Sequence, residues 1–482
     1  MADDATDTNT HKLPQGFNDL TPQVRSRFYR HAPAERTETH KACLDAILNS
    51  VVKFNDGYLT CFGDNAPVAG NSLGAAVDAA QLNTRSLKRG EIKKLLPKVT
   101  YVQRHAYYPG FPRFLAVNGA VTFNTWKPAQ RLLITEGDFK KWIKSKKPVD
   151  NSLDGLEGQD FAFVFSYETM PLMWATLMKM LFGNAFSAVK SENWLEEQWD
   201  FTRWAACVVH KPMTRPLWAP VLRSVHGVGK GTFEAVMRAL MGSAAVNTVA
   251  NLEGLTAEHN GDAALTRLLV LNEVLQKGRD TKADQRLKMF VSDPVIEINR
   301  KHEQRFFTLA THATILYSNS RTPFVVPKTE RRFWVPAYRE YDVGEDHGQA
   351  FHAEGNAHIR ENLKHPELIH ELLCWLKLIA DTTPAKFLSV APPSDGIQEM
   401  YDIVSEDKHD DLKMWLEQLG TTDAVQLVQV QEQVNVVQGE LIDLLKRFGF
   451  RNCQMKSIGN KKVWTKAPSG QGPKTLRQYN AT

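Results

Sequence analysis

The sequence has few cysteines, no long apolar run and little excess charge, and the first two shortages each argue against a class of protein. Its five cysteines in 482 residues form no Cys-x-x-Cys pair, which argues against a disulfide framework and a zinc site. The longest apolar stretch, residues 170–189, is interrupted by Lys179 and Gly183, so we predict a buried helix there and no membrane contact. The acidic amino terminus lacks the apolar core of a secretory signal. We therefore expect a protein of a reducing cytoplasm.

The charge balance gives little direct information about partners. The 59 Lys and Arg residues against 54 Asp and Glu residues leave a net charge of +5. Any affinity for nucleic acid must therefore come from the local placement of basic residues. The length allows roughly three domains, each with a buried core.

The most informative segment is a glycine-rich loop that follows an apolar run (218–222) and precedes a helical run (233–241). Such a loop can point backbone amides at a phosphate while Lys230 supplies positive charge. The common P-loop spelling has a hydroxyl directly after the lysine, but here Gly231 occupies that position and Thr232 could supply the hydroxyl for Mg²⁺. The alternative is an ordinary glycine-bearing turn before a helix. The predicted ATP-binding residues are Gly227, Val228, Gly229, Lys230, Gly231 and Thr232.

Two apolar runs downstream end in polar residues suited to nucleotide chemistry. Residues 267–273 predict a buried strand with Glu273 at its carboxyl end, where ligands gather in open α/β sheets. Glu273 is the candidate general base, and Asn272 with Glu273 and Thr232 is a candidate magnesium set. Residues 313–319 predict a further strand whose Asn319 could hydrogen-bond a γ-phosphate or the attacking water. The alternative for Asn319 is a residue that opens a turn.

A pair of arginines precedes the next apolar run. Arg331 or Arg332 could act as an arginine finger, the guanidinium that stabilises charge in phosphoryl transfer. The alternative is a surface ion pair with Glu330.

In the order and spacing of these elements, residues 204–337 resemble the superfamily 3 helicases, and most closely the helicase part of phage and plasmid primase-helicases. The Phe123–Pro128 segment extends the resemblance forward to about residue 101. The resemblance implies an AAA+-like hexameric ring that hydrolyses ATP at subunit interfaces and moves on single-stranded DNA. It also implies that Lys230 holds the phosphates and Glu273 activates water.

The segment Ser292–His302 looks like the DNA-binding hairpin of that family. The alternation in residues 295–299 predicts one strand and Phe306–Leu309 the return strand. The tip would then present Arg300, Lys301 and His302 to a central pore, where they would bind DNA phosphates without base preference. The alternative is a solvated turn.

The predicted fold is an α/β P-loop ATPase core of AAA+-like type, with a helical collar and a winged-helix-like carboxyl-terminal domain. We place the domain limits at 1–95 (no assigned role), 96–150 (β-rich, with a hairpin at Asn118-Gly119), 151–205 (helical collar), 206–345 (ATPase), 346–395 (helix and linker), 396–470 (winged-helix-like) and 471–482 (flexible tail).

The resulting functional hypothesis is a replicative DNA helicase of phage or mobile-element type that uses ATP and Mg²⁺ on single-stranded and forked DNA. The first 160 residues contain no Asp-x-Asp or Ser-x-His pattern that would supply primase metal ligands, so a separate primase or polymerase is the expected partner. Two alternatives stay open. One is an ATP-switched protein that binds or loads at an origin, and the other is a P-loop ATPase that acts on protein.

Overall fold

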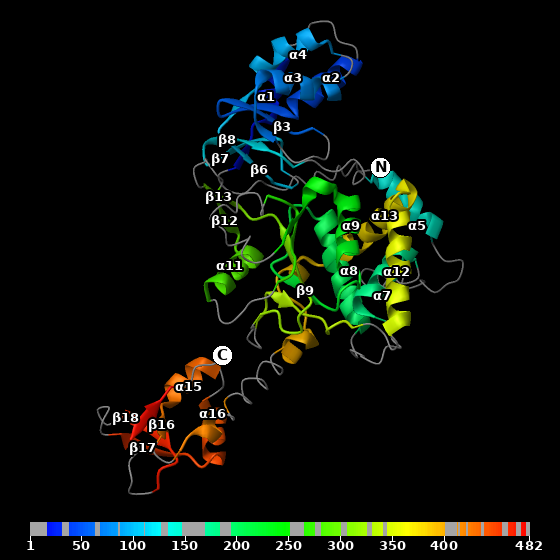
Figure 1. Ribbon diagram of the computed structural model, residues 1–482. Coiled ribbons are helices and arrows are strands. Elements are labelled where there is room, and N and C mark those ends of the chain that lie inside the picture. Colours follow the sequence, from blue (N-terminus) through cyan, green and yellow to red (C-terminus); the bar gives the residue numbers. More distant parts are fainter. Residues whose placement is uncertain are drawn as a thin grey trace, which may run out of the picture.

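Figure 1 shows the structure of the protein, a computed structural model. The structure describes residues 17–30, 38–62, 68–84, 87–109, 111–126, 134–146, 169–183, 194–250, 265–274, 281–299, 306–324, 330–340, 345–400, 412, 415–420, 423–434, 438–455, 461–468 and 474–478.

The central element is a five-stranded parallel sheet with the order β10-β11-β14-β9-β15. Its strands are β9 (Ala219–Arg223), β10 (Val246–Val249), β11 (Leu268–Leu271), β14 (Ala313–Ser318) and β15 (Phe333–Trp334). Every residue of β9, β11 and β14 is buried, as expected for parallel strands covered on both faces. The predicted mixed α/β architecture with a parallel sheet is confirmed.

Alternate residues of each strand enter different cores. Leu268 and Val270 of β11 pack into a cluster with the helices of one face. Leu269 and Leu271 pack into a second cluster with α11 and the β12–β13 hairpin. The helices of the first face are α7 (Leu172–Phe182), α8 (Trp194–His210), α9 (Lys230–Met241), α12 (Glu345–Asn362) and α13 (Pro366–Thr382), with α5 (Glu136–Lys146) against α13. The second face has α11 (Thr281–Ser292), β12 (Val295–Ile298) and β13 (Phe306–Leu309).

The helices predicted as a collar do not have a core of their own. Trp174 of α7 and Trp204 of α8 are fully buried in the same cluster as Trp375 of α13 and Leu222 of the central sheet. The segments before and after the sheet in the sequence therefore stabilise one common core.

An amino-terminal unit combines two four-stranded sheets, with the orders β4-β3-β2-β5 and β1-β7-β8-β6, and a group of helices. Its elements are β1 (Phe17–Asp19), α1 (Thr21–Tyr29), α2 (Glu38–Leu48), β2 (Val51–Phe54), β3 (Gly57–Thr60), β4 (Val68–Asn71), α3 (Leu73–Asn83), α4 (Arg89–Leu95), β5 (Tyr101–Val102), β6 (Arg104–Ala106), β7 (Phe114–Val117) and β8 (Ala120–Asn124). One hydrophobic cluster runs from Val24 to Phe123, across the limit drawn from sequence between residues 95 and 96.

The predicted hairpin at Asn118-Gly119 is confirmed. The two residues have φ of 49° and 81°, and Val117 pairs with Ala120 across the turn. Positive φ at both positions is what a two-residue hairpin turn requires, and Asn followed by Gly accepts it at low cost.

The carboxyl-terminal unit has its own hydrophobic cluster. Its elements are β16 (Asp423–Val425), α15 (Leu427–Val434), α16 (Gln438–Arg447), β17 (Arg451–Met455), β18 (Lys461–Thr465) and β19 (Thr475–Arg477), with the sheet order β17-β18-β16-β19. β17 and β18 pair as an antiparallel hairpin, with Arg451 opposite Thr465 and Met455 opposite Lys461.

The prediction of a flexible tail over 471–482 is wrong for residues 475–477. They form β19, which pairs in parallel with β16, and the Nε of Arg477 lies 3.0 Å from the Oδ1 of Asp423. The pairing uses backbone groups and one long-range ion pair, neither of which produces an apolar pattern in the local sequence.

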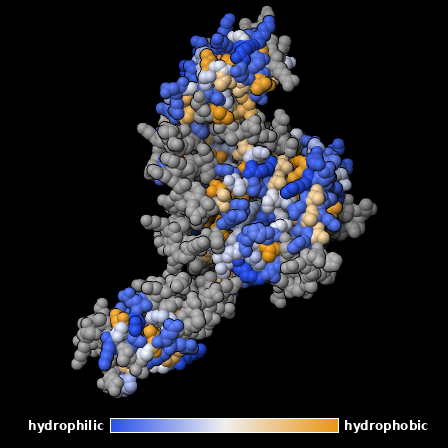
Figure 2. Space-filling view, viewed as in Figure 1, coloured by the Kyte–Doolittle hydropathy of each residue, from blue (hydrophilic) through white to orange (hydrophobic). Residues whose placement is uncertain are grey.

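No helix of the described ranges is both long enough and apolar enough to cross a membrane. In the view of Figure 2 most of the coloured surface is hydrophilic, with apolar residues in small scattered groups.

Candidate functional site

The loop between β9 and α9 depends on two glycines with positive φ. Gly227 has φ of 84° and Gly229 has φ of 108°, a conformation that L side chains rarely adopt. A Cβ on Gly229 would also lie 3.0 Å from the Cε of Met180 in α7. The chain then enters α9 at Lys230, so the amino end of this helix, with its free N–H groups, opens beside the loop.

The Lys230 ammonium group lies at the end of the sheet and is surrounded by neutral oxygens. Its Nζ donates to the Oγ of Ser224 (2.6 Å), the Oδ1 of Asn319 (2.8 Å) and the backbone oxygen of Ser318 (3.3 Å). Burial lowers the pKa of Lys230 to about 8, because the charged form loses hydration. A half-buried cation whose hydrogen-bond partners among the described residues are all neutral gains from an anion placed beside it.

A cavity of about 620 Å³ opens over this lysine. It is lined by His226, Gly227, Gly229, Lys230, Gly231, Thr232, Glu234, Asn272, Glu273, Tyr317, Asn319, Ala353, Asn356, Ala357 and Arg360. The structure thus brings most of the residues predicted for ATP, Mg²⁺ and catalysis around one space. Val228 of the predicted loop is instead buried in the protein at 1% exposure.

Glu273 follows β11 and has an unusual backbone. Its φ is 49°, although it is not a glycine. The flanking residues are fixed, because the N–H of Asn272 donates to Val249 (2.8 Å) and the N–H of Val274 donates to Tyr317 (2.9 Å). Non-glycine residues in this region cost roughly 1 to 3 kcal/mol and concentrate at functional sites. The result is an exposed carboxylate at the cavity wall.

Asn319 follows β14, the strand that lies between β9 and β11. This order places its side chain between the lysine-bearing loop and Glu273. Its neighbour Ser318 is buried and donates to the backbone oxygen of Val274 (2.8 Å), so it ties the end of β14 to the segment that carries Glu273. Ser318 and Asn319 therefore link the end of β14 to the segment that carries Glu273 and to Lys230, and do more than begin a turn.

Helix α12 also lines this cavity, which was not predicted from the sequence. Ala353, Asn356, Ala357 and Arg360 lie on one face of the helix at spacings of three, four and seven residues, the periodicity of a helix stripe. The Oγ1 of Thr232 donates to the Oδ1 of Asn356, and the Nδ2 of Asn356 donates to the oxygen of Gly227 (3.4 Å). The helical spacing of these four cavity residues is the feature of the sequence from which their common position could have been predicted.

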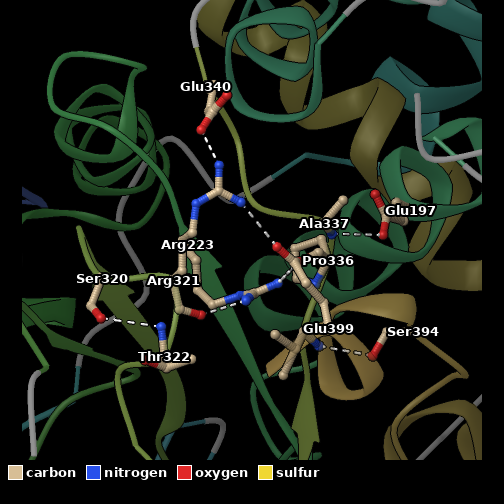
Figure 3. Close-up of polar contacts among 11 residues, drawn as sticks. Glu197, Arg223, Ser320, Arg321, Thr322, Pro336, Ala337, Glu340, Ser394 and Glu399 are labelled. Atoms are coloured by element: carbon tan, nitrogen blue, oxygen red, sulfur yellow. Dashed lines mark hydrogen bonds and ion pairs between the residues drawn. The ribbon is translucent and has the colours of Figure 1, made fainter. Parts of the chain in front are cut away.

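A buried arginine connects the loop to the segment beyond α13 (Figure 3). Arg223, with a side chain of 0% exposure, donates to the backbone oxygens of Arg321 (2.6 Å) and Pro336 (3.0 Å) and to the Oε2 of Glu399 (2.7 Å). Gly396 allows this approach, since a Cβ there would lie 2.4 Å from the oxygen of Pro336. Gly396 and Glu399 are therefore held against the end of β9, the strand that precedes the glycine-rich loop.

The same figure shows a buried carboxyl beside this cluster. The Oε1 of Glu197 in α8 accepts from the N–H of Ala337 (3.1 Å), and the residue is 6% exposed. Burial raises the pKa of Glu197 to about 7; the hydrogen bond from Ala337 opposes the shift without cancelling it.

The two predicted finger arginines lie away from the cavity of their own chain. They precede β15, whose Phe333 pairs with Ala219, the first residue of β9, whereas the glycine-rich loop follows the last residue of β9. Arg331 is exposed, and the NH1 of Arg332 lies 3.1 Å from the Oε1 of Glu330.

Glu330 is held from two sides. The Nζ of Lys288 lies 3.3 Å from its Oε2. Burial alone would raise the pKa of Glu330, but hydrogen bonds from Arg332 and the charge of Lys288 outweigh that effect and lower it. The ion pair weighed as the alternative for the arginines is thus present for Arg332, while Arg331 remains exposed.

The predicted hairpin of β12 and β13 is confirmed, with Val295 opposite Leu309 and Ile298 opposite Phe306. Its predicted DNA-contacting tip, Arg300 to His302, lies outside the described residues. The base of the hairpin is tied to the amino-terminal unit, because the hydroxyls of Tyr108 and Thr308 lie 2.7 Å apart.

Within the described ranges no group of three or more His, Cys, Asp or Glu residues is arranged to hold a metal ion. A magnesium ion that arrives with a nucleotide needs few protein ligands, because phosphates and waters complete its shell. Thr232, Asn272 and Glu273 line the cavity and remain the candidates for that role.

Comparison with known families gives one match. Residues 222–332 match a family of unknown function, DUF5906. This segment contains the glycine-rich loop, Glu273, the hairpin and Asn319. No curated protein sequence matches the chain.

Among solved structures, the fold is similar to "The apo structure of NrS-1 C terminal region (305-718)", with a TM-score of 0.52, 16% identity and coverage of 88% of this chain and 89% of that one. A second structure of that region, in the A form, gives a TM-score of 0.50, 16% identity and coverage of 86% and 87%. A structure of JCV helicase with a bound acetamide compound covers 54% of this chain and 76% of that one at 15% identity, but its TM-score of 0.22 carries no argument. The chain therefore shares an overall fold with the NrS-1 region.

Proposed function

We propose that this protein is an ATP-dependent DNA helicase of the superfamily 3 type, which binds Mg²⁺-ATP in the cavity between the glycine-rich loop and α12 and moves on single-stranded DNA. The observation that carries the proposal is the convergence of Lys230, Thr232, Glu273 and Asn319 on that cavity from three parallel strands and the start of one helix.

The cavity fits a magnesium nucleotide in charge, size and polar groups. Lys230 is a half-buried cation whose partners among the described residues are neutral, and the cavity volume of about 620 Å³ lies within the range of small-ligand sites. The hydroxyl of Tyr317, which lines the cavity, has no hydrogen-bond partner among the described residues despite 2% exposure of the side chain. A buried donor of this kind is stabilised when a ligand supplies an acceptor.

The absence of a side chain at Gly231 also favours a bound magnesium nucleotide. A Cβ on Gly231 would meet no atom within 4 Å, so the position where common P-loops carry the metal-binding hydroxyl is open space. Thr232 is the nearest hydroxyl in the sequence and lines the cavity. We assign it the Mg²⁺ contact, and the ion would supply charge neutralisation for the phosphates.

The protein groups then have separate tasks. Lys230 compensates the negative charge of the β- and γ-phosphates. Glu273 accepts a proton from the attacking water, and its constrained backbone keeps the carboxylate at the cavity wall. Asn319, already hydrogen-bonded to Lys230, orients the water or the γ-phosphate. Arg331 or Arg332 completes the site of a neighbouring subunit in a ring, most readily a hexamer.

Two substitutions test the chemistry. Lys230→Ala should lose nucleotide binding and hydrolysis together, whereas Glu273→Gln should bind normally and lose turnover by at least about 100-fold. Equilibrium binding of a fluorescent ATP analogue and phosphate release in the same preparation measure both. Wild-type hydrolysis in both variants would refute the active site.

A third substitution tests the DNA part of the proposal. The double variant Lys301→Ala/His302→Ala should hydrolyse ATP but fail to unwind a forked duplex, with Lys462→Ala, an exposed lysine of β18, as a charge-matched control. If wild-type protein hydrolyses ATP without any stimulation by DNA and unwinds nothing, the helicase proposal fails and an ATPase that acts on protein replaces it.

A further inference from the structure

We propose that helix α12 is a second wall of the nucleotide site, in which Asn356 orients the Thr232 hydroxyl toward the metal and Arg360 contacts the phosphates directly. This inference rests on the proposed function, and neither the family match nor the fold comparison assigns a role to α12, which begins after residue 332.

The orientation argument follows from the hydrogen-bonding capacity of a hydroxyl. Threonine has one proton to donate and two lone pairs to accept with. In this structure the Thr232 proton is given to the Oδ1 of Asn356, and the Asn356 amide is oriented by its own bond from Nδ2 to Gly227. The lone pairs of Thr232 are thereby left for a cation. A partner that fixes a metal ligand from behind typically changes metal affinity by roughly 10- to 100-fold when removed.

The case for Arg360 rests on placement and on the charges around it. It lies one helical turn beyond Asn356 on the same face and lines the same cavity, with its side chain exposed. No ion pair is found for its guanidinium within the described part of the chain, whereas the next basic residue, Lys364, pairs with Glu361. Arginine is suited to phosphate because its planar N–H groups can donate in pairs.

The approach of α12 to the loop is built into the packing. Met180 of α7 lies between the two elements: a Cβ on Gly229 would be 3.0 Å from its Cε, and a Cβ on Gly355 would be 2.6 Å from its Sδ. Glycine on both sides of one methionine lets the helix and the loop come close enough for the Asn356 bonds. The close approach of α12 to the loop is therefore set by the packing of three elements.

Equilibrium binding of a fluorescent ATP analogue, measured with Mg²⁺ and again with EDTA, tests both residues. Asn356→Ala should weaken binding by roughly tenfold or more with Mg²⁺ and leave binding in EDTA within about twofold, since only the metal contact is affected. Arg360→Ala should weaken binding by roughly 10- to 100-fold in both conditions, because a phosphate contact does not need the metal. Lys364→Ala, four residues further on, is the matched control and should bind as wild type.

Lys230→Ala in the same assay separates this inference from the proposed function. If Lys230→Ala loses binding while Asn356→Ala and Arg360→Ala bind as wild type, α12 is only a cover and the inference is overturned. Equal losses with Mg²⁺ and with EDTA in Asn356→Ala would overturn the orienting role. If Lys230→Ala binds as wild type, the proposed nucleotide site itself is wrong.

Discussion

Replacement of Glu197 by glutamine offers a quantitative test of how this core is held together. The carboxyl is 6% exposed and burial raises its pKa to about 7 from an ordinary value of 4.5. The folded state holds the proton of Glu197 more tightly than the unfolded state does, so protonation stabilises the fold. This stabilisation is fully present below pH 4.5 and is lost as the pH rises through 7. With these two pKa values, the free energy of unfolding should fall by about 2.5 kcal/mol between pH 5 and pH 8 through this one group.

Glu197→Gln removes the titration but keeps an oxygen for the N–H of Ala337. The variant should therefore be close to wild type in stability at pH 5 and more stable at pH 8, by up to about 2.5 kcal/mol. Thermal unfolding of the unit that contains the central sheet, followed by tryptophan fluorescence at several pH values, measures the difference. Parallel pH profiles for the two proteins would show that Glu197 is ionised in the folded state already at pH 5, and would refute the argument.

Three further predictions concern the ends of the central sheet. If Arg331 acts across a subunit interface, Lys230→Ala subunits mixed with Arg331→Ala subunits should regain part of the hydrolysis that each lacks alone, and demonstrably mixed assemblies without rescue would contradict it. Glu399→Ala should lower the free energy of unfolding by roughly 2 to 4 kcal/mol, because Arg223 remains buried and charged with only carbonyl partners. Glu340→Ala, which removes the exposed partner of Arg321, should cost less than about 1 kcal/mol in the same thermal-unfolding assay.

The parts of the site that the sequence predicted are those that local pattern and sheet geometry determine. Apolar runs before Arg223, Asn272 and Asn319 indicate buried parallel strands, and such strands must end at the same edge of a sheet. Glycine spacing and one lysine identify the loop, because few other residues accept its backbone. These three facts place Lys230, Glu273 and Asn319 together without any knowledge of the tertiary structure.

The parts that the sequence did not predict depend on contacts between distant segments. Asn356 reaches Thr232 across 124 positions of the chain, and Glu399 reaches Arg223 across 176. Residues 345–362 have mixed composition, with His, Ala, Gly and Asn, and their pattern is equally compatible with a solvated helix. Likewise β19 is defined by backbone pairing with β16, which leaves no trace in hydropathy. Polar contacts between distant segments fix particular side chains in space, but they produce no periodic pattern in the sequence.

The arrangement of the charged groups also constrains the assembly that the proposed function requires. The cavity opens at the carboxyl end of β9, and Arg331 precedes the strand that pairs with the amino end of β9. The five residues of β9 separate these two ends by roughly 16 Å at about 3.3 Å per residue. If Arg331 serves a cavity of this kind, that cavity therefore belongs to another copy, whose cavity face lies against the Arg331 surface of this one. Such an interface joins two different patches of the same chain, and repeated contacts of this head-to-tail type close into a ring or continue into a filament. Under the proposed function, a closed ring would have a composite site at every interface.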